Sequence, residues 1–260
     1  MRLVRHGRAL VGFAGVACFA LAAVAYAQST PVAVPDAAPV QVAPLDDKPA
    51  TWGDAKAGQT KAGACAACHG LDGNAMQQNA PRIAGMPERY IAQQLALFKH
   101  GERTSGLAGL MAPYAAPLSN QDMRDLGAWF ATQKAGSGVA DDTVIAAGPG
   151  KGMKFYQIGE RLYRGGDAAR GIPSCMACHG PSGGGNPGPS YPSLHGQEAA
   201  YVVRRLEEYR AGTTTYKNAA HFNLMASVAK PLSDEEIRSL GSYVQGLHAR
   251  ASAKPATAAP

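Results

Sequence analysis

The sequence predicts an all-α protein built from two tandem helical domains, and three observations support this prediction. A Cys-x-x-Cys-His segment at residues 65–69 returns at residues 175–179, which reveals an internal repeat. Apolar residues recur at helical spacing in both copies, whereas no stretch shows the alternating β-branched pattern of a sheet. The repeated region is long enough for two small domains of about 100 residues each.

The two copies align along most of their length. The offset between them is 110 residues at the Cys motifs, 111 at segments 81–85 and 192–196, and 114 at the Leu-Ser pairs 118–119 and 232–233. The small drift indicates short insertions in loops, so we expect both copies to keep the same helices.

The chain begins with the features of an export signal. Three arginines within the first eight residues precede an uncharged apolar run at 9–24, and Ala25-Tyr26-Ala27 follows as a cleavage site. The run is shorter than the roughly 20 apolar residues of a membrane-spanning helix. Because Gly15 stands where a lipoprotein signal has a branched residue, we do not expect Cys18 to be lipidated. The signal predicts a periplasmic protein.

Composition sets the remaining boundaries. Segment 28–51 is rich in Ala, Pro and Val without any period, and the C-terminal end has the same character. A Gly-rich segment separates the copies and suits a linker that runs over the surface. The predicted parts are a signal peptide (1–27), a disordered Ala/Pro tether (28–51), a first domain (52–134), a linker (135–152), a second domain (153–249) and a disordered tail (250–260).

Each copy predicts a short helix before the Cys motif, around 54–62 and around 157–163. Gly58 and Gly159 lie in these helices and would allow a close helix contact. Later helices present apolar faces at the spacing i, i+4, i+7 or begin with a capping box. The faces are Ile91, Leu95 and Phe98, matched by Val202, Leu206 and Tyr209; the capping boxes are Ser119 with Asp122 and Ser233 with Glu236, which precede Met123, Leu126, Trp129 and Phe130, matched by Ile237, Leu240, Tyr243 and Val244.

The charge balance argues against a nucleic-acid-binding protein. The chain has 25 basic and 19 acidic residues, and removal of the three signal arginines leaves 22 minus 19, a net charge of +3. Residues 28–145 hold 9 basic and 11 acidic side chains, whereas residues 146–260 hold 13 and 8. Such an asymmetry can orient an encounter with a redox protein partner, although an ordinary solvated surface shows similar differences.

The repeated motif is the attachment signature of c-type haem. Cys65 and Cys68 can each bond one vinyl group of a porphyrin, and His69 is then held beneath the iron as its proximal ligand. Cys175, Cys178 and His179 repeat this arrangement. The sequence therefore predicts two covalently bound haem c groups, with the two histidines as iron ligands.

Three other interpretations fit the cysteines less well. A zinc site would need four ligands grouped around one metal, and a thioredoxin-like pair does not need the histidine that follows. A disulfide framework would leave both histidines without a role. After signal cleavage all remaining cysteines belong to the two motifs.

The sixth ligand of each iron decides between electron transfer and small-molecule chemistry. Met111 and Met225 each stand seven residues before the Leu-Ser pair of their copy, 42 and 46 residues beyond the motif histidine. We predict that both lie on loops and complete His/Met ligation. His221, four residues before Met225, is an alternative ligand without a counterpart in the first copy. The other methionines considered are Met76, Met86, Met123 and Met153.

The ring of a proximal histidine is oriented by a hydrogen bond from its Nδ1 atom. Pro81 and Pro192 occupy the same repeat position, and their carbonyls can accept this bond. Each proline can also simply turn the loop. We include both among the cofactor-binding residues.

Longer segments resemble the dihaem cytochrome c4 family of the bacterial periplasm. The resemblance covers about residues 53–248. The segments that carry it are CAACHGLDGN (65–74), PRIAG (81–85) followed by Tyr90 and Gln94-Leu95, GERLYRGG (159–166), PLSDE (231–235) and SYVQGLH (242–248).

This resemblance implies two class I cytochrome c domains, each wrapped around its haem and related by a pseudo-twofold axis. It implies His/Met ligation at both irons and electron transfer from respiratory-chain donors to a terminal oxidase or another acceptor. The tether at 28–51 departs from the compact start of the family and leaves peripheral membrane association open.

We expect an electron carrier rather than an enzyme, because no further acid, base or nucleophile cluster accompanies the haem motifs. An alternative is the haem subunit of a flavocytochrome-type dehydrogenase, which the sequence does not separate from a carrier. A dihaem peroxidase is a third hypothesis, against which the matched Met residues argue.

Overall fold

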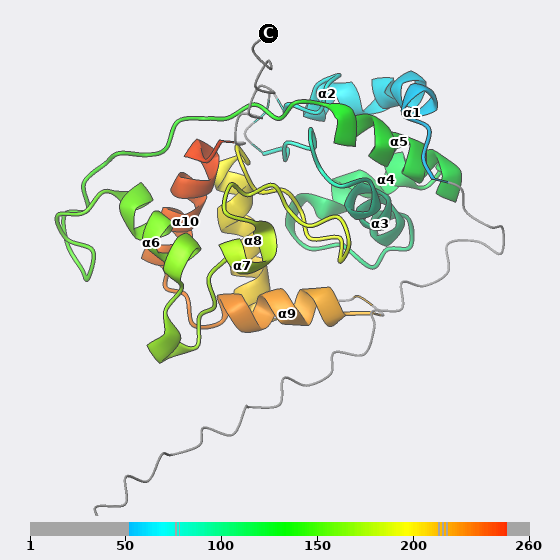
Figure 1. The fold of residues 1–260 in the computed structure, drawn as a ribbon. Helices are drawn as coiled ribbons and strands as arrows, with labels where there is room; N and C mark the ends of the chain where they lie inside the picture. Colours follow the sequence, from blue (N-terminus) through cyan, green and yellow to red (C-terminus); the bar gives the residue numbers. More distant parts are fainter. Residues whose placement is uncertain are drawn as a thin grey trace, which may run out of the picture. The chain divides into compact units, whose positions relative to one another are not determined.

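The structure is a computed structural model that describes residues 52–75, 77, 79–212, 214, 216 and 218–248. The predicted signal peptide, tether and tail lie outside these residues, as does Met76. Within the described ranges all regular elements are helical, and extended pairing is limited to isolated bridges (Figure 1). None of the described helices is both long and apolar enough to span a membrane.

The described part of the first copy contains five α-helices and two 3₁₀ turns. Its helices lie in the order that the sequence predicts, and the Cys motif forms the end of η1 and all of α2. The elements are α1 (Ala55–Lys61), η1 (Ala62–Cys65), α2 (Ala66–His69), α3 (Glu88–Lys99), η2 (Gly106–Met111), α4 (Ala112–Ala115) and α5 (Asn120–Thr132).

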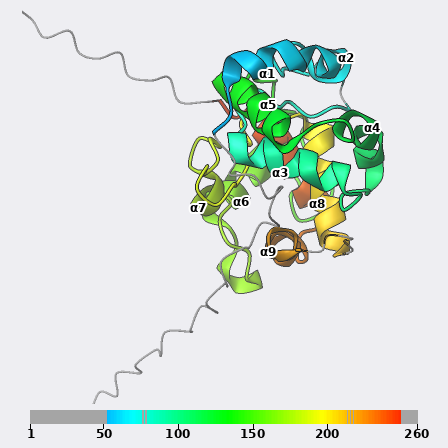
Figure 2. The same cartoon turned by 90° about the vertical axis from the view of Figure 1, so that its right-hand side faces the viewer.

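The second copy repeats this order, and both copies belong to one compact unit. In both, the first and last helices pack side by side, as two perpendicular views show for α1 and α5 (Figures 1 and 2). The elements are α6 (Phe155–Gly165), η3 (Ala168–Arg170), α7 (Met176–His179), α8 (Ala199–Ala211), α9 (Ala220–Ala229) and α10 (Asp234–Gly246).

The predicted close contact of the first helix in each copy is confirmed. A Cβ atom added to Gly58 would overlap the carbonyl oxygen of Asp125 on α5, and one added to Gly159 would overlap that of Ser239 on α10. Only glycine permits so close a backbone approach. The two glycines therefore set the distance between the first and last helices.

The last helix of each copy begins at the predicted capping box. Ser119 accepts from the backbone of Asp122, whose side chain accepts in turn from the backbone of Ser119. Ser233 and Glu236 make the same reciprocal pair at α10. These bonds satisfy backbone donors that the first turn of a helix leaves unpaired.

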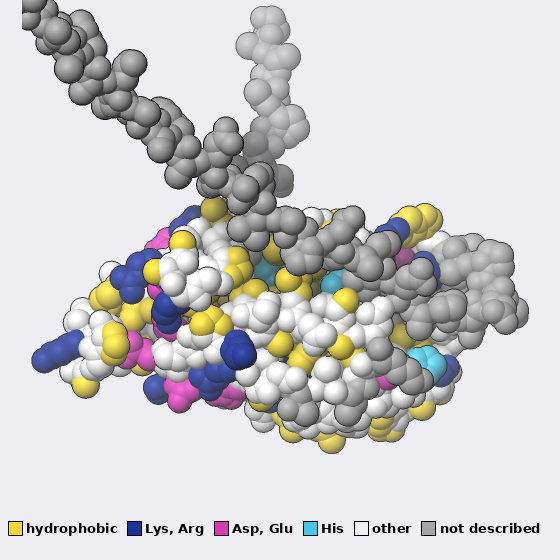
Figure 3. Space-filling view, turned by 90° about the horizontal axis from the view of Figure 1, so that it is seen from below, with side chains coloured by type: hydrophobic (Ala, Val, Ile, Leu, Met, Phe, Trp, Pro, Cys, Tyr) yellow, Lys and Arg dark blue, Asp and Glu magenta, His cyan; other side chains and the backbone are white. Residues whose placement is uncertain are grey.

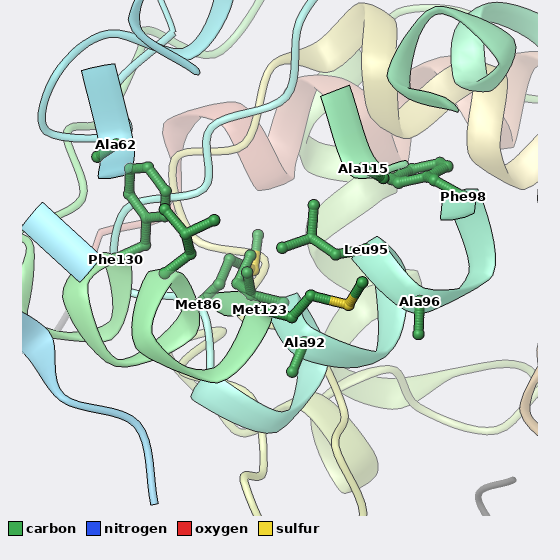
Figure 4. Close-up of a cluster of buried hydrophobic side chains, with 11 residues drawn as sticks. Ala62, Met86, Ala92, Leu95, Ala96, Phe98, Ala115, Met123 and Phe130 are labelled. Carbon is green, nitrogen blue, oxygen red and sulfur yellow. The ribbon is translucent and has the colours of Figure 1, made fainter. Parts of the chain in front are cut away.

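Each copy has its own apolar core. In the first, Met86, Leu95, Met123 and Phe130 face one another between α3 and α5 (Figure 4). The predicted face of α3 is buried, with Ile91, Leu95 and Phe98 less than a tenth exposed. The matching face of α8 is only half-buried and packs against the rim of the second core.

The predicted linker does not run only over the surface. Ile145 is buried in the second core. Gly138 and Asp141, earlier in the same segment, make hydrogen bonds to α10. The Gly138 N–H donates to the Gln245 carbonyl, and the Asp141 N–H donates to the Ser242 hydroxyl. An apolar side chain within the Gly-rich segment thus anchors it to the second copy.

An ion network joins α1 to α5 in the first copy. The Lys61 ammonium lies 2.6 Å from carboxylates of both Asp122 and Asp125. The hydrogen bond from Lys61 lowers the pKa of Asp122 to about 2. Asp125 is buried, and its carboxylate also accepts the backbone N–H of Asp54, the N-cap of α1.

Gly159→Ala is expected to destabilise the protein by about 3 kcal/mol, because the added methyl forces α6 away from α10. Thermal unfolding followed by circular dichroism measures the loss. Gly165→Ala in the same helix is the matched control, since nothing lies within 4 Å of its added Cβ. Equal stability of the two variants would contradict the proposed helix spacing.

Lys61→Met is expected to lower the free energy of unfolding by about 1–2 kcal/mol at neutral pH. Because the folded pKa of Asp122 lies below its ordinary value of 3.8, this stabilisation is present above pH 3.8 and fades as pH falls towards 2. Denaturant titrations of both proteins across this range test it.

The control for Lys61→Met is Arg164→Met, which breaks the exposed Arg164–Glu160 pair and should cost less than about 0.5 kcal/mol. A stability difference between wild type and Lys61→Met that persists unchanged at the acid end would show that the ion network is not its source.

Candidate haem sites

Both Cys motifs fold into one short helical turn. Cys65 ends η1 and Cys68 lies on α2, while Cys178 lies on α7, which follows Cys175. Cysteines at positions i and i+3 of a turn project from the same side, as two bonds to one porphyrin require. Each turn ends at a glycine with positive φ, 76° at Gly70 and 80° at Gly180, which accounts for the Cys-His-Gly sequence.

Each motif histidine is held by a proline carbonyl. The Nδ1 atom of His69 lies 2.8 Å from the Pro81 oxygen, and that of His179 lies 2.9 Å from the Pro192 oxygen. Because a carbonyl oxygen only accepts, Nδ1 carries the proton in both rings and Nε2 keeps its lone pair. This tautomer is the one that a metal ligand needs.

Burial also favours the neutral imidazole. His69 and His179 are each 7% exposed, and desolvation lowers the pKa of both rings against the opposing effect of the proline carbonyls. A neutral ring is the form that binds a metal ion. Both histidines are therefore prepared as ligands.

The cysteines do not have the properties of a redox-active thiol pair. Burial raises the pKa of the Cys65 thiol and raises that of Cys175 to about 11, whereas reactive pairs need a lowered pKa. All four motif cysteines are free, so a disulfide framework does not describe them. Within the described residues no three His, Cys, Asp or Glu side chains converge on a metal position.

The predicted residues of the first copy line one cavity. Its empty space is about 1170 Å³, counting the opening to solvent. Thiols, imidazole and thioether meet there within a wall that is mainly apolar, so the cavity fits a covalently attached porphyrin. Among the lining residues are Cys65, Cys68, His69, Pro81, Ile83, Met86, Tyr90, Leu95, Phe98, Met111, Leu126 and Phe130.

Two methionines line this cavity. Met111 is half-buried at the end of η2, whereas Met86 is buried in the apolar core. Met123 is also fully buried in that core (Figure 4). Of the three, Met111 is the one that is only partly buried, at the edge of the core, and its role as iron ligand stays a prediction.

The second copy connects its motif to α9 through aromatic rings. The Tyr191 ring lies 6.1 Å from that of His179 and 5.8 Å from that of His221, measured between centroids. His221 and Met225 are one turn apart on α9. The Tyr191 ring thus links the second motif to His221 on α9, the helix that also carries Met225.

The predicted loop position of the two methionines is wrong. Met111 ends a 3₁₀ turn, and Met225 lies inside the ten-residue helix α9. The difference has a local cause: Gly109 and Pro113 interrupt the first segment, whereas Ala, Leu and Met form α9 without a glycine or proline.

Residues of the second copy also line the first cavity. Gln197, Tyr201 and Arg205 belong to the second copy, and Arg103 joins them from the first. Sequence analysis missed this group, because its members become neighbours only when the copies pack together. One signal was present: Tyr90 and Tyr201 occupy the same repeat position at offset 111.

Comparisons with known proteins agree with this geometry. The Cytochrome c family profile matches residues 55–134 and 157–248. Cytochrome c4 of Pseudomonas aeruginosa is 43% identical over 197 residues, which cover 75% of this chain and 90% of that protein. The crystal structure of reduced recombinant cytochrome c4 from Pseudomonas stutzeri gives a TM-score of 0.64 at 38% identity and covers 75% of this chain and 100% of that one.

A third relative carries a different name. The "thiosulfate dehydrogenase electron acceptor" of Stutzerimonas stutzeri is 36% identical over 181 residues, which cover 69% of this chain and 77% of that protein.

The tandem helical copies, each with a Cys-x-x-Cys-His turn, define a dihaem c-type cytochrome. Its cofactors are two covalently bound haem c groups, its activity is electron transfer, and its partners are redox proteins. The chain belongs to the cytochrome c4 family, as the resemblance in its sequence predicts.

Replacement of Cys65 and Cys68 by Ala is expected to reduce the haem content from two to one per chain, because the first porphyrin loses both attachment bonds. The pyridine haemochrome spectrum of denatured protein measures covalent haem. Cys18→Ala is the control and should leave two haems. Retention of two haems by the double variant would contradict attachment at this motif.

Proposed function

We propose that this chain is a periplasmic electron carrier that accepts electrons from respiratory-chain donors and delivers them to a terminal oxidase or another acceptor. Its haems would be bound through Cys65 and Cys68 and through Cys175 and Cys178. His69 with Met111, and His179 with Met225, would ligate the two irons. Pro81 and Pro192 would orient the histidines.

The observation that carries this proposal is the hydrogen bond from histidine Nδ1 to a proline carbonyl, present in both copies. The bond directs each Nε2 lone pair away from the proline loop and fixes the ring. A methionine at the same repeat position of each copy supplies a second ligand type. Two six-coordinate irons favour electron transfer over substrate binding.

A bound haem supplies a one-electron couple at its iron. The chain supplies the surroundings: the proline carbonyls hold the imidazole rings, and the apolar side chains of the first cavity exclude water. Exclusion of water and a thioether ligand both favour the reduced, less charged iron. The side chains thus raise the reduction potential without taking part in bond making.

On this proposal the protein is not an enzyme. The proposal assigns no acid, base or nucleophile to a bond-making step, and a closed coordination sphere would leave no position for peroxide. Slow or absent peroxide turnover by the purified protein would distinguish it from a dihaem peroxidase.

Export by residues 1–27 would place the carrier in the periplasm, where segment 28–51 could tether it near the membrane. On the one face that Figure 3 shows, basic and acidic side chains intermingle with hydrophobic ones. Such a mixed surface suits brief contacts with redox proteins rather than one permanent partner.

A second candidate is the electron-accepting partner of a dehydrogenase. The similarity to a relative named for accepting electrons from thiosulfate dehydrogenase favours it, as does the fold that this chain shares with part of a thiosulfate dehydrogenase structure. A flavocytochrome subunit would instead co-purify with a flavoprotein. Rapid reduction by a purified dehydrogenase, without a stable complex, would favour the soluble acceptor.

The first test is the absorption spectrum of the oxidised and reduced protein with a challenge by carbon monoxide. Two low-spin haems that show the Met-to-ferric-iron band and resist carbon monoxide are expected. An iron that binds carbon monoxide readily in the resting protein would contradict His/Met ligation at both sites.

Met111→Ala and Met225→Ala are each expected to remove about half of the Met-to-ferric-iron band and to open one iron to carbon monoxide. The potential of the affected haem should fall, since the thioether stabilises ferrous iron. Met123→Leu, in the core, is the control and should keep the full band. If Met225→Ala keeps it while His221→Ala alters the second haem, His221 is the ligand.

A further inference from the structure

The two copies meet beside the first haem cavity. The Arg82 guanidinium lies 2.7 Å from the Glu198 carboxylate, and the Gln197 side chain exchanges two hydrogen bonds of 2.8 Å with the backbone of Arg82. Tyr201 and Arg205 on α8 line the cavity together with residues of the first copy. The wall of the first cavity is therefore shared between the copies.

Arg103 is a buried cation in this shared wall. Arg103 is only 6% exposed. Its guanidinium donates to the Gln94 side-chain oxygen at 2.6 Å and to the Tyr201 hydroxyl at 3.1 Å. Its Nε atom is buried and has no hydrogen-bond partner. Within the described part of the chain Arg103 forms no ion pair, although a buried charge without a counter-ion costs several kcal/mol.

Neighbouring carboxylates already have partners. Glu198 pairs with Arg82, and Glu208 pairs with Arg205, which is itself buried. Arg204 adds a further positive charge to the same wall. The wall between the copies thus holds more buried positive than negative charge. The unpaired Nε–H group belongs to Arg103, which lines the cavity.

We propose that Arg103 binds a propionate carboxylate of the first haem, and that Tyr201 holds the guanidinium in place from the second copy. The inference rests on the proposed function, since it requires a haem in this cavity. The carboxylate would neutralise Arg103 and occupy the free Nε donor. The bound haem would then complete a contact that joins the two copies.

The arrangement is specific to one haem. At the offsets of 111 to 114 that relate the copies in this region, Arg103 matches residues 214–217, which are Thr-Thr-Tyr-Lys, so the second copy offers no guanidinium at the matching place. A positive charge beside a haem favours its reduced form, which has one positive charge fewer. Arg103 should therefore raise the potential of the first haem and leave that of the second nearly unchanged.

The test uses the purified dihaem protein and its Arg103→Gln variant, in which glutamine keeps hydrogen-bonding capacity but removes the charge. Spectroelectrochemical titration follows the two reduction steps, and resonance Raman spectra follow the propionate bending modes. Haem methyl resonances in the NMR spectrum assign each step to its haem. Arg161→Gln, on the exposed side of α6, removes the same charge at a distance.

The expected result is a lower potential for the first haem alone and a shifted propionate bending mode in Arg103→Gln. Arg103→Lys should recover most of the potential but not the Raman mode, because an ammonium lacks the guanidinium fork. Tyr201→Phe, which leaves the charge in place, should shift the Raman mode with a smaller change in potential, and it remains informative where Arg103→Gln does not fold.

Unchanged potentials and Raman modes in a folded, two-haem Arg103→Gln protein would overturn the proposal, as would an equal effect of Arg161→Gln. A shift of the potential without any change in the Raman mode would overturn the direct contact. Failure of the proposed function is separate, because it would appear in the wild-type spectrum as a missing haem or an open iron.

Discussion

The close crossing of the first and last helices is the constraint on which each copy depends. Gly58 and Gly159 bring the backbone of α1 against α5 and that of α6 against α10. In the first copy the haem-binding turn follows α1 directly, so the crossing fixes where that turn begins, whereas η3 lies between α6 and the second turn. In the first copy the last helix also supplies Leu126 and Phe130 to the cavity. One backbone contact thus orients both the attachment turn and the wall it faces.

The two copies support this crossing with different chemistry. In the first, Lys61 joins α1 to two carboxylates of α5. In the second, Tyr163 and Tyr243 pack with ring centroids 5.3 Å apart, and the Tyr163 hydroxyl donates to the carbonyl of Gly180 at 2.7 Å. That bond connects the helix crossing to the glycine that ends the second Cys motif. The first crossing therefore includes an ion network that depends on pH, whereas the second is packed by two buried aromatic rings, one of which makes a neutral hydrogen bond.

Sequence reasoning succeeded where an interaction is local or repeated. The capping boxes, the two helix glycines and the haem motifs each depend on residues a few positions apart or on their recurrence in both copies. It failed where neighbours are distant in the chain. The burial of Ile145 depends on the second core, and the partners of Arg103 come from both copies. The helix through Met225 was missed because repeat logic transferred the glycine- and proline-broken first segment onto a sequence that lacks both breakers.

The shared cavity wall gives the duplication a physical consequence. If the first copy stood alone, the cavity wall formed by Gln197, Tyr201 and Arg205 would be replaced by water. Water around an iron site favours the oxidised, more highly charged state and lowers the reduction potential. On the proposed position of the first haem, the second copy would therefore shield that haem from water, in addition to carrying a haem of its own. The ion pair between Arg82 and Glu198 and the hydrogen bonds of Gln197 hold this wall in place. Contacts between the copies would in this way contribute to the potential at which the first haem accepts an electron.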